Sequence, residues 1–262
     1  MTVLKLEEIS IYFGGLKAVS SFNLQLEEGE LMGLIGPNGA GKTTIFNMIT
    51  GVYAPSKGDI YLRQKDSLKK IAGLKPYQIT RLGMARTFQN IRLFKDLSVL
   101  DNVRIAHHFN IQYNALQSIF RTPGFYKEEA EAMEKALELL KLFNIDQKCD
   151  ELAKNLPYGE QRKLEIARAL ATNPRLLLLD EPAAGMNPQE TIDLMQLIQF
   201  IREKFNLTIL LIEHDMNLVM GICERIVVLD YGQVIAEGNP EAIKHNPRVI
   251  KAYLGEEVEA GA

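Results

Sequence analysis

The chain has 262 residues, with 30 Lys and Arg against 33 Asp and Glu, and a formal net charge of -3 at pH 7. Because the charge is spread along the chain, the sequence excludes the basic surface that binds nucleic acid. No apolar run approaches the roughly 20 residues that cross a bilayer, and charges interrupt the first ten residues, so we expect a soluble chain without signal peptide. Cys149 and Cys223 lie far apart, which predicts two structural thiols in a reducing cytosol rather than a disulfide or zinc site.

The first half of the chain begins with predicted strands. Alternating apolar residues predict strands at 3–11 and 22–28, the second ending in a turn at Glu28 and Gly29. A continuous apolar run at 31–36 predicts a strand buried on both faces. The elements expected next are a helix through Met48, a strand at 58–62, a short helix at 76–83 and a strand at 84–89.

Residues from about 97 to 145 differ in character. Apolar residues recur there at helical spacing, with Met133, Leu137 and Leu140 expected on one face, which predicts a helical insertion. The α/β pattern then resumes. The expected elements are a helix after 157–160, a strand at 175–180, a helix from 188, a strand at 207–213, a hairpin at 225–238 and short helical pieces.

The helix from 188 has a clear start signal. Asn187 is a good N-cap, Pro188 suits the first helical position, and Glu190 stands three residues after the cap. This spacing predicts a capping box.

The segment GPNGAGKT, from Gly36 to Thr43, joins the buried strand to the next helix, as in a phosphate-binding P-loop. Backbone N–H groups must wrap a triphosphate, and a β-carbon at the glycines would obstruct the turn or the approach. Lys42, which we expect to be exposed, would span the β- and γ-phosphates, and Thr43 would hold Mg²⁺. The alternative is a structural turn without a ligand.

A second element, LLLLDEP, ends a buried strand at Asp180. Ligand sites in open parallel sheets lie at the carboxyl ends of the strands, where Asp180 could fix magnesium through its waters. Glu181 could take a proton from the attacking water. Taken alone such residues usually mark only a strand end, but together with the P-loop they favour a site.

Six motifs in a fixed order resemble those of the ATPase subunit of ABC transporters, and the resemblance covers the whole chain. They are the P-loop, FQN with Gln89, PYGEQ with Gly159, LLLLDEP, AGMN at 184–187 and LIEHD with His214. The resemblance implies a single ABC ATPase domain of α/β class, with a P-loop NTPase (RecA-like) parallel sheet core, an N-terminal antiparallel β subdomain and an inserted α-helical subdomain. It assigns 1–90 and 165–262 to the core with its β subdomain, and 91–164 to the helical subdomain carrying the signature motif.

The same resemblance implies roles for single residues, with ATP and Mg²⁺ as cofactors. Glu181 would be the catalytic base, Gln89 the γ-phosphate sensor and His214 the switch that positions the water. Phe13, or less well Tyr12, would stack on adenine, although an early aromatic or a lone histidine is more often structural. The other nucleotide-binding residues would be Gly36, Asn38, Gly39, Ala40, Gly41, Lys42, Thr43, Thr44, Tyr158 and Gly159. The metal ligands would be Thr43, Gln89 and Asp180.

The signature motif departs from the family pattern. The family has LSGGQ, whereas this chain has LPYGE at 156–160. Pro157 has neither a hydroxyl nor an N–H, so it cannot make the γ-phosphate contact of the usual serine. Gly159 and the helix start can still present N–H groups to phosphate.

Within the family, RTFQN, LPYGEQRKLEIARAL and YLG look most like the ATP-binding subunit of branched-chain amino acid importers. That resemblance implies two ATPase subunits, identical or paralogous, that close on ATP at the cytoplasmic face of the membrane. Their partners would be transmembrane permease subunits and an extracytoplasmic substrate-binding protein, with no nucleic acid. The alternatives are an exporter ATPase such as that for lipopolysaccharide, a soluble non-transport ABC ATPase, and a P-loop kinase or GTPase, for which no N-K-x-D motif is present.

The segment from Asn90 to Leu100 mixes apolar and basic residues directly after Gln89. It could line a cleft that accepts a short cytoplasmic helix of a permease, with Phe94 as an exposed aromatic anchor. Alternatively, it could be the core-facing start of the helical insertion, with Phe94 buried.

Overall fold

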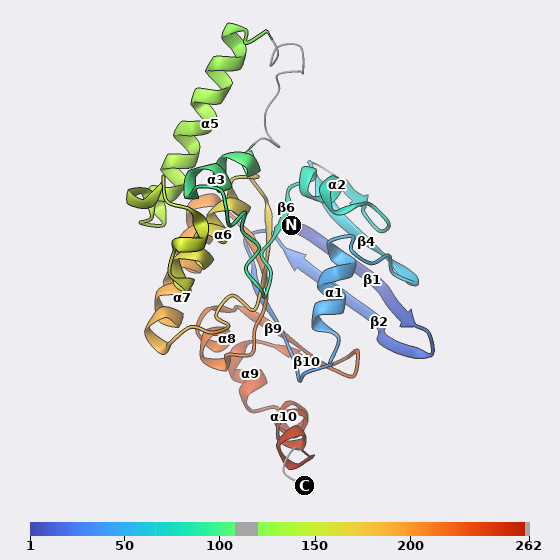
Figure 1. Ribbon diagram of the computed structural model, residues 1–262. Helices are drawn as coiled ribbons and strands as arrows, with labels where there is room; N and C mark the ends of the chain where they lie inside the picture. Colours follow the sequence, from blue (N-terminus) through green and yellow to red (C-terminus); the bar gives the residue numbers. More distant parts are fainter. Residues whose placement is uncertain (66, 108–119, 260–262) are drawn as a thin grey trace. The chain divides into compact units, whose positions relative to one another are not determined.

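The computed structural model of the protein describes residues 1–65, 67–107 and 120–259 (Figure 1). The chain divides into two compact units, one of residues 1–86 and 175–262 and the other of residues 87–174. The strands are β1 Thr2–Phe13, β2 Leu16–Glu27, β3 Leu31–Ile35, β4 Lys57–Gln64, β5 Ser67–Lys70, β6 Met84–Arg86, β7 Leu176–Asp180, β8 Thr208–Ile212, β9 Arg225–Asp230 and β10 Gln233–Gly238. The helices are α1 Lys42–Ile49, α2 Pro76–Arg81, α3 Val99–His107, α5 Pro123–Leu142, α6 Tyr158–Leu170, α7 Pro188–Phe205, α8 Met216–Ile222, α9 Pro240–Lys244 and α10 Pro247–Glu259, with the 3₁₀ turns η2 Asp146–Lys148 and η3 Ala153–Asn155.

Among the described residues, the strands of the first unit form two sheets. One has the order β10-β9-β3-β8-β7-β6 and is parallel except for β10, and the other is antiparallel with the order β2-β1-β4-β5. In the parallel sheet β3, β7 and β8 are buried along their whole length, as their continuous apolar runs predict. The α/β fold with a parallel core, an antiparallel β subdomain and inserted helices is therefore confirmed.

Alternate residues of β3 pack into different layers. Met32 and Leu34 belong to one core with Ile45 and Phe46 of α1 and the inner face of the antiparallel sheet. Gly33 faces the other way, where an added β-carbon would lie 3.0 Å from Cys223 Sγ. Helix α1 is thus held between two sheets, which fixes the loop that precedes it.

Several predicted details are confirmed and others are wrong. Asn187 caps α7 with the predicted box, because its side chain accepts from the Glu190 N–H and the Glu190 carboxylate accepts from the Asn187 N–H. The strand expected over 84–89 ends at Arg86, since β6 pairs with β7 only as far as that residue. Strand β5 and helix α8 are not predicted from the sequence, because their short segments carry little periodicity.

Helix α5 buries a stripe that shares only Leu140 with the expected one. Its buried residues are Ala132, Ala136 and Leu140, whereas Met133 is 38% exposed. The buried positions are four residues apart, so they share one side of the helix, and alanine allows close packing against α3 and α6. The prediction favoured the larger apolar residues Met133 and Leu137, whereas the helix buries the alanines that precede each of them.

Both cysteines are free, and Cys223 is buried. Burial raises the pKa of its thiol to about 12, so it stays protonated and inert. None of the helices in the described part of the chain is long and apolar enough to cross a membrane.

Candidate functional site

The glycine-rich loop from Gly36 to Gly41 has two separate needs for glycine. A β-carbon on Gly36 would lie 2.1 Å from the Leu229 carbonyl oxygen, and one on Gly41 would lie 2.9 Å from that of Ala18. Gly39 has open space around it but a φ of 77°, which L side chains rarely adopt. Two of these glycines therefore permit close backbone packing, and the third permits the turn itself.

Lys42, at the start of α1, is only 5% exposed, so the expectation of an exposed lysine is wrong. Its Nζ donates to the carbonyl oxygens of Gly36 and Pro37, at 2.6 and 2.8 Å. The loop thus folds around its own lysine, because an ammonium group taken out of water needs acceptors. A phosphate bound by this loop would be a further acceptor for the same charge.

The turn between β9 and β10 supports the loop from far along the sequence. The N–H of Gly232 donates to Ala40 O at 2.9 Å, and its carbonyl accepts from Ser20 N at 3.0 Å. The adjacent Tyr231 is exposed and lines the same cavity as the P-loop. No local pattern in the sequence predicts this support, since it joins residues almost 200 positions apart.

Asp180 ends β7 in a buried position, as predicted, and it forms an ion pair that the sequence did not reveal. Arg86 Nη2 donates to Asp180 Oδ2 at 2.6 Å, and both side chains are almost fully buried. Arg86 Nη1 donates to the side-chain oxygens of Asn47 in α1 and of Thr50, the C-cap of that helix, at 2.8 and 3.1 Å. One guanidinium therefore fastens Asp180 to the helix that follows the P-loop.

Glu181 and His214 meet directly. His214 Nε2 lies 2.7 Å from Glu181 Oε1, although the residues come from the ends of different strands, β7 and β8. Glu181 has a φ of 47°, a conformation that non-glycine residues seldom adopt and that turns its side chain away from the strand direction. Its own N–H donates to Ile212 O at 2.9 Å, which fixes this turn to β8.

Glu213 positions the backbone around this pair. Its carboxylate accepts from the N–H groups of Ala183, His214 and Asp215, at 2.7, 2.9 and 3.3 Å. Burial raises the pKa of the Glu213 carboxyl, and the backbone donors oppose that rise. In the sequence Glu213 belongs to the LIEHD motif, and nothing in that motif indicates a supporting role.

These groups line one cavity of about 420 Å³, a size that suits a small molecule. The aromatic Phe13, 43% exposed, contributes to the lining together with Leu16 and Lys17 of the following turn and strand. The remaining lining residues are Ala18, Asn38, Gly39, Ala40, Gly41, Lys42, Thr43, Thr44, Glu181, His214 and Tyr231. The cavity thus combines an aromatic surface, a loop of backbone donors and a carboxylate–histidine pair.

The other predicted site residues belong to the second unit. Gln89 precedes α3, and its carbonyl accepts from Arg162 Nη2 at 2.9 Å. Tyr158 is the first residue of α6, Gly159 the second, and Pro157 is the N-cap, with no side-chain cap hydrogen bond. Phe13, the P-loop, Asp180, Glu181 and His214 all belong to the first unit, whereas Gln89, Tyr158 and Gly159 belong to the second.

The donors expected for magnesium have the right chemistry. Thr43 offers a hydroxyl, Asp180 a carboxylate and Gln89 an amide oxygen, and Mg²⁺ prefers oxygen ligands. Within the described residues there is no cluster of three or more His, Cys, Asp or Glu that could form an all-protein metal cage.

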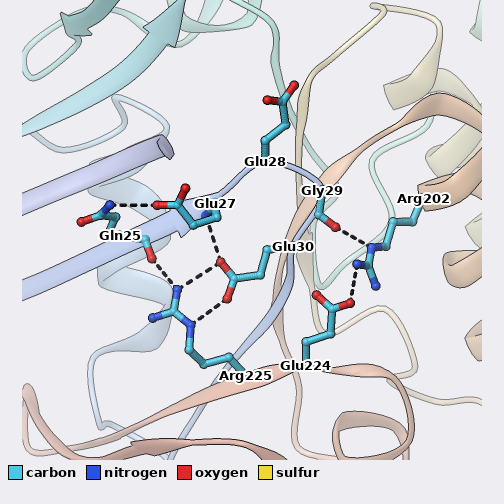
Figure 2. Close-up of a pocket in the computed structure, with 8 residues that line it drawn as sticks. All are labelled: Gln25, Glu27, Glu28, Gly29, Glu30, Arg202, Glu224 and Arg225. Atoms are coloured by element: carbon cyan, nitrogen blue, oxygen red, sulfur yellow. Dashed lines mark hydrogen bonds and ion pairs between the residues drawn. The ribbon is translucent and has the colours of Figure 1, made fainter. Parts of the chain in front are cut away.

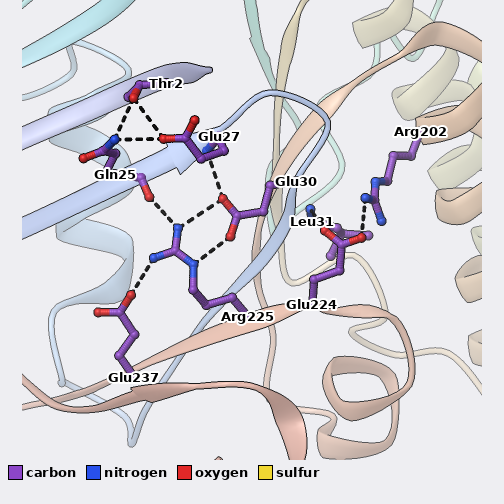
Figure 3. A network of polar contacts seen from close by, with 9 residues as sticks. All are labelled: Thr2, Gln25, Glu27, Glu30, Leu31, Arg202, Glu224, Arg225 and Glu237. Carbon is purple, nitrogen blue, oxygen red and sulfur yellow. Dashed lines mark hydrogen bonds and ion pairs between the residues drawn. The ribbon is translucent and has the colours of Figure 1, made fainter.

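A larger cavity, of about 630 Å³, lies at the other ends of the parallel strands (Figure 2). Four glutamates and two arginines line it, and Arg225 forms a fork to both oxygens of Glu30, at 2.7 and 3.1 Å. Arg202 donates to Gly29 O at 2.7 Å (Figure 2) and to Glu224 Oε1 at 2.5 Å (Figure 3). Because its arginines bind neighbouring groups and its excess charge is negative, this cavity does not suit a triphosphate.

The parallel sheet, the phosphate-type loop and the carboxylate at the adjacent strand end define the class of P-loop nucleotide-binding proteins. The family model described as "ABC transporter" matches residues 19–184, and the model "Branched-chain amino acid ATP-binding cassette transporter" matches residues 233–259. The chain therefore belongs to the ABC transporter family, which confirms the resemblance seen in the sequence.

Two relatives are similar over nearly their whole length. The high-affinity branched-chain amino acid transport ATP-binding protein BraF of Pseudomonas aeruginosa is 49% identical, over 97% of this chain and 98% of its own. The corresponding LivG protein of Escherichia coli K12 is 47% identical, with the same coverage.

Solved structures agree with the fold. A crystal structure of the ADP conformation of an ATP-binding cassette of an ABC transporter has a TM-score of 0.83 and 32% identity, over 97% of this chain and 99% of its own. A dimeric ATP-binding cassette in a post-hydrolysis state, bound to ADP and Pi, has a TM-score of 0.75 and 27% identity, over 90% and 98%.

Proposed function

We propose that the chain is the ATP-hydrolysing subunit of a membrane importer of branched-chain amino acids. The observation that carries the enzymatic part is the cavity in which the P-loop meets Glu181 and His214, whose side chains lie 2.7 Å apart. The proposed substrate class rests on the relatives named above and on the C-terminal match at residues 233–259. The matched relatives give no support to the alternatives of an exporter or a soluble ATPase.

The proposed chemistry follows from what each group can hold. N–H groups of the P-loop and Lys42 bind the phosphates, and Phe13 contacts the base. Glu181 accepts the proton of the attacking water, while His214 holds that water and the γ-phosphate in place. Thr43, Asp180 and Gln89 would hold magnesium, which would supply positive charge against the phosphates.

Glu181→Gln tests the proposed base. The change removes proton acceptance at nearly constant shape, so turnover should fall by roughly 10²–10⁴ while ATP binding survives. ATPase rate and nucleotide affinity should be measured on the same preparation. A variant with native turnover would exclude Glu181 as the base, and one that binds no ATP would exclude a purely chemical role.

The proposed partners are a second ATPase subunit, two ATP molecules bound between the subunits, and transmembrane permease subunits at the cytoplasmic face of the membrane. Tyr158 and Gly159 would then meet the nucleotide of the partner subunit, and a substrate-binding protein would join through the permease. We assign 1–90 and 165–262 to the ATPase core in this scheme, and 91–164 to the helical subdomain. Uptake of labelled leucine should require both ATP and an intact Glu181.

Phe94 is the proposed contact to the permease. The side chain is 49% exposed, so the alternative of a core position is wrong, and the Arg168 guanidinium lies 5.4 Å from the ring centre. The buried Asn102 side chain accepts from Phe94 N at 2.9 Å and donates to Phe94 O at 3.0 Å. This exposed aromatic is therefore held in a fixed position, as a binding anchor requires.

Phe94→Ala should abolish uptake in a reconstituted complex while ATP affinity and the melting temperature of the isolated subunit stay unchanged. Phe120→Ala, at another exposed aromatic of the same unit, is a matched control. Loss of uptake with Phe120→Ala as well, or a clear fall in melting temperature with Phe94→Ala, would contradict the assignment.

A further inference from the structure

Helix α6 contains a buried ion pair that the proposed chemistry does not use. Arg162 and Glu165 are 0% and 1% exposed in their side chains, and Arg162 Nη1 lies 2.7 Å from Glu165 Oε2. Burial raises the pKa of the Glu165 carboxyl, and the charge of Arg162 opposes that rise. A buried charge pair is seldom worth its desolvation for stability alone, so its other contacts indicate what it does.

Those contacts are to the backbone on both sides of Gln89. Arg162 Nη1 donates to Phe88 O at 2.7 Å, and Nη2 donates to Gln89 O at 2.9 Å. Glu165 Oε1 accepts from the N–H groups of Phe88 and Arg92, at 3.4 and 3.1 Å. The pair therefore binds both donors and acceptors of one short segment.

The same guanidinium also reaches the start of its own helix. Arg162 Nη2 lies 3.4 Å from the hydroxyl of Tyr158, which accepts a weak hydrogen bond. Tyr158 and the following Gly159 form the first turn of α6, at the place where the signature departs from the family pattern. A single side chain thus contacts the segment of Gln89 and the segment of Tyr158.

We infer that Arg162 and Glu165 are positioning residues that make residues 88–92 and the first turn of α6 one rigid body. This inference rests on the proposed function, in which Gln89 meets the γ-phosphate in its own subunit and Gly159 faces the partner's nucleotide. A shift of Gln89 on nucleotide binding then carries Tyr158 and Gly159 with it. The clamp sets how strongly ATP, as distinct from ADP, favours the closed dimer.

Arg162→Lys is the sharpest test. Lysine keeps the charge and can still meet Glu165, but it lacks the planar fork that contacts two carbonyls and Tyr158 together. Hydrogen exchange at the amides of Phe88 and Arg92 should become at least about tenfold faster. In a Glu181→Gln background, the ATP concentration that half-saturates dimerisation should rise at least about tenfold, while the ADP affinity of the monomer changes less than about twofold.

Arg104→Lys is the matched control. Arg104 is an ion-paired arginine of the same unit, 3.1 Å from both Asp101 and Glu129, and these ion pairs lie within α3 and join it to α5 rather than to residues 88–92 or α6. This control should leave the two amides and the dimerisation midpoint unchanged. Equal effects of the two variants would reduce the pair to general packing and overturn the inference, as would native exchange and a native midpoint in Arg162→Lys.

Two measures keep the outcome decisive. If Arg162→Lys does not fold, the double variant Arg162→Met, Glu165→Met removes both charges together, which buried pairs often tolerate, and the same measurements apply. Exchange needs no nucleotide, so it tests the clamp even if the native chain binds no ATP. A native chain that binds no ATP would contradict the proposed function. The exchange rates would still decide whether Arg162 and Glu165 hold residues 88–92 in place.

Discussion

The two ends of the parallel sheet hold charged side chains in different ways. At the carboxyl ends, backbone carbonyls bind Lys42, and Glu181 itself has a positive φ. Both side chains line a cavity. At the amino ends, Arg225 and Glu30 bind one another in a fork (Figure 3). The fork at the amino ends binds two charges to each other and joins neighbouring elements, whereas Lys42 and Glu181 line a cavity whose size suits a small molecule. Cavity size alone does not distinguish them, since the larger cavity is the one with paired charges.

The largest effect should come from Lys42→Ala at the carboxyl end. Nucleotide affinity should fall at least about a hundredfold, because charged hydrogen bonds are worth about 1.5–3 kcal/mol each. Since Lys42 also binds Gly36 and Pro37, stability should fall by about 1–3 kcal/mol, seen in urea unfolding without nucleotide. Native affinity in this variant would contradict the P-loop assignment.

Arg86→Met should give the next largest effect. The change leaves Asp180 buried without its ion-pair partner, which costs about 3–5 kcal/mol in comparable pairs. Arg86→Lys, which keeps the charge, should recover a large part of that stability but not the contacts to Asn47 and Thr50. Equal unfolding midpoints for native protein and Arg86→Met would show that the pair contributes nothing to stability.

Arg225→Met at the amino end should have a smaller effect than either of these two changes. Its pairs with Glu30 and Glu237 are partly open to water, so the loss should be about 1 kcal/mol or less, a melting shift of about 2–4 °C. ATP affinity and turnover should be unchanged. A fall in turnover at unchanged stability would contradict the division between the two ends.

Lys154→Met, which removes an exposed pair with Asp96, is the control for charge loss alone. It should move the melting temperature less than Arg225→Met does. An equal shift would mean that the network at the amino end adds no more than any surface pair.

Features that depend on neighbouring residues in the sequence could be predicted, and those that depend on distant residues could not. The glycine-rich loop, the strand end at Asp180 and the capping box at Asn187 are specified by a few adjacent residues. The burial of Lys42 and the role of Arg86 depend on which carbonyls and carboxylates the fold brings near them. A charged residue inside the strand expected at 84–89 was the available signal for Arg86.

The support for the P-loop by the β9–β10 turn sets an order of events during synthesis. Strand β3 pairs with β8 and β9, and Ala40 accepts a hydrogen bond from Gly232, so the loop lacks both neighbours until the last part of the chain is made. At about 5–20 residues per second, the ribosome needs roughly 10–40 seconds to go from Gly41 to Gly232. The nucleotide pocket is thus encoded early but completed late, and a chain truncated before residue 232 would carry the whole P-loop sequence without its finished binding site.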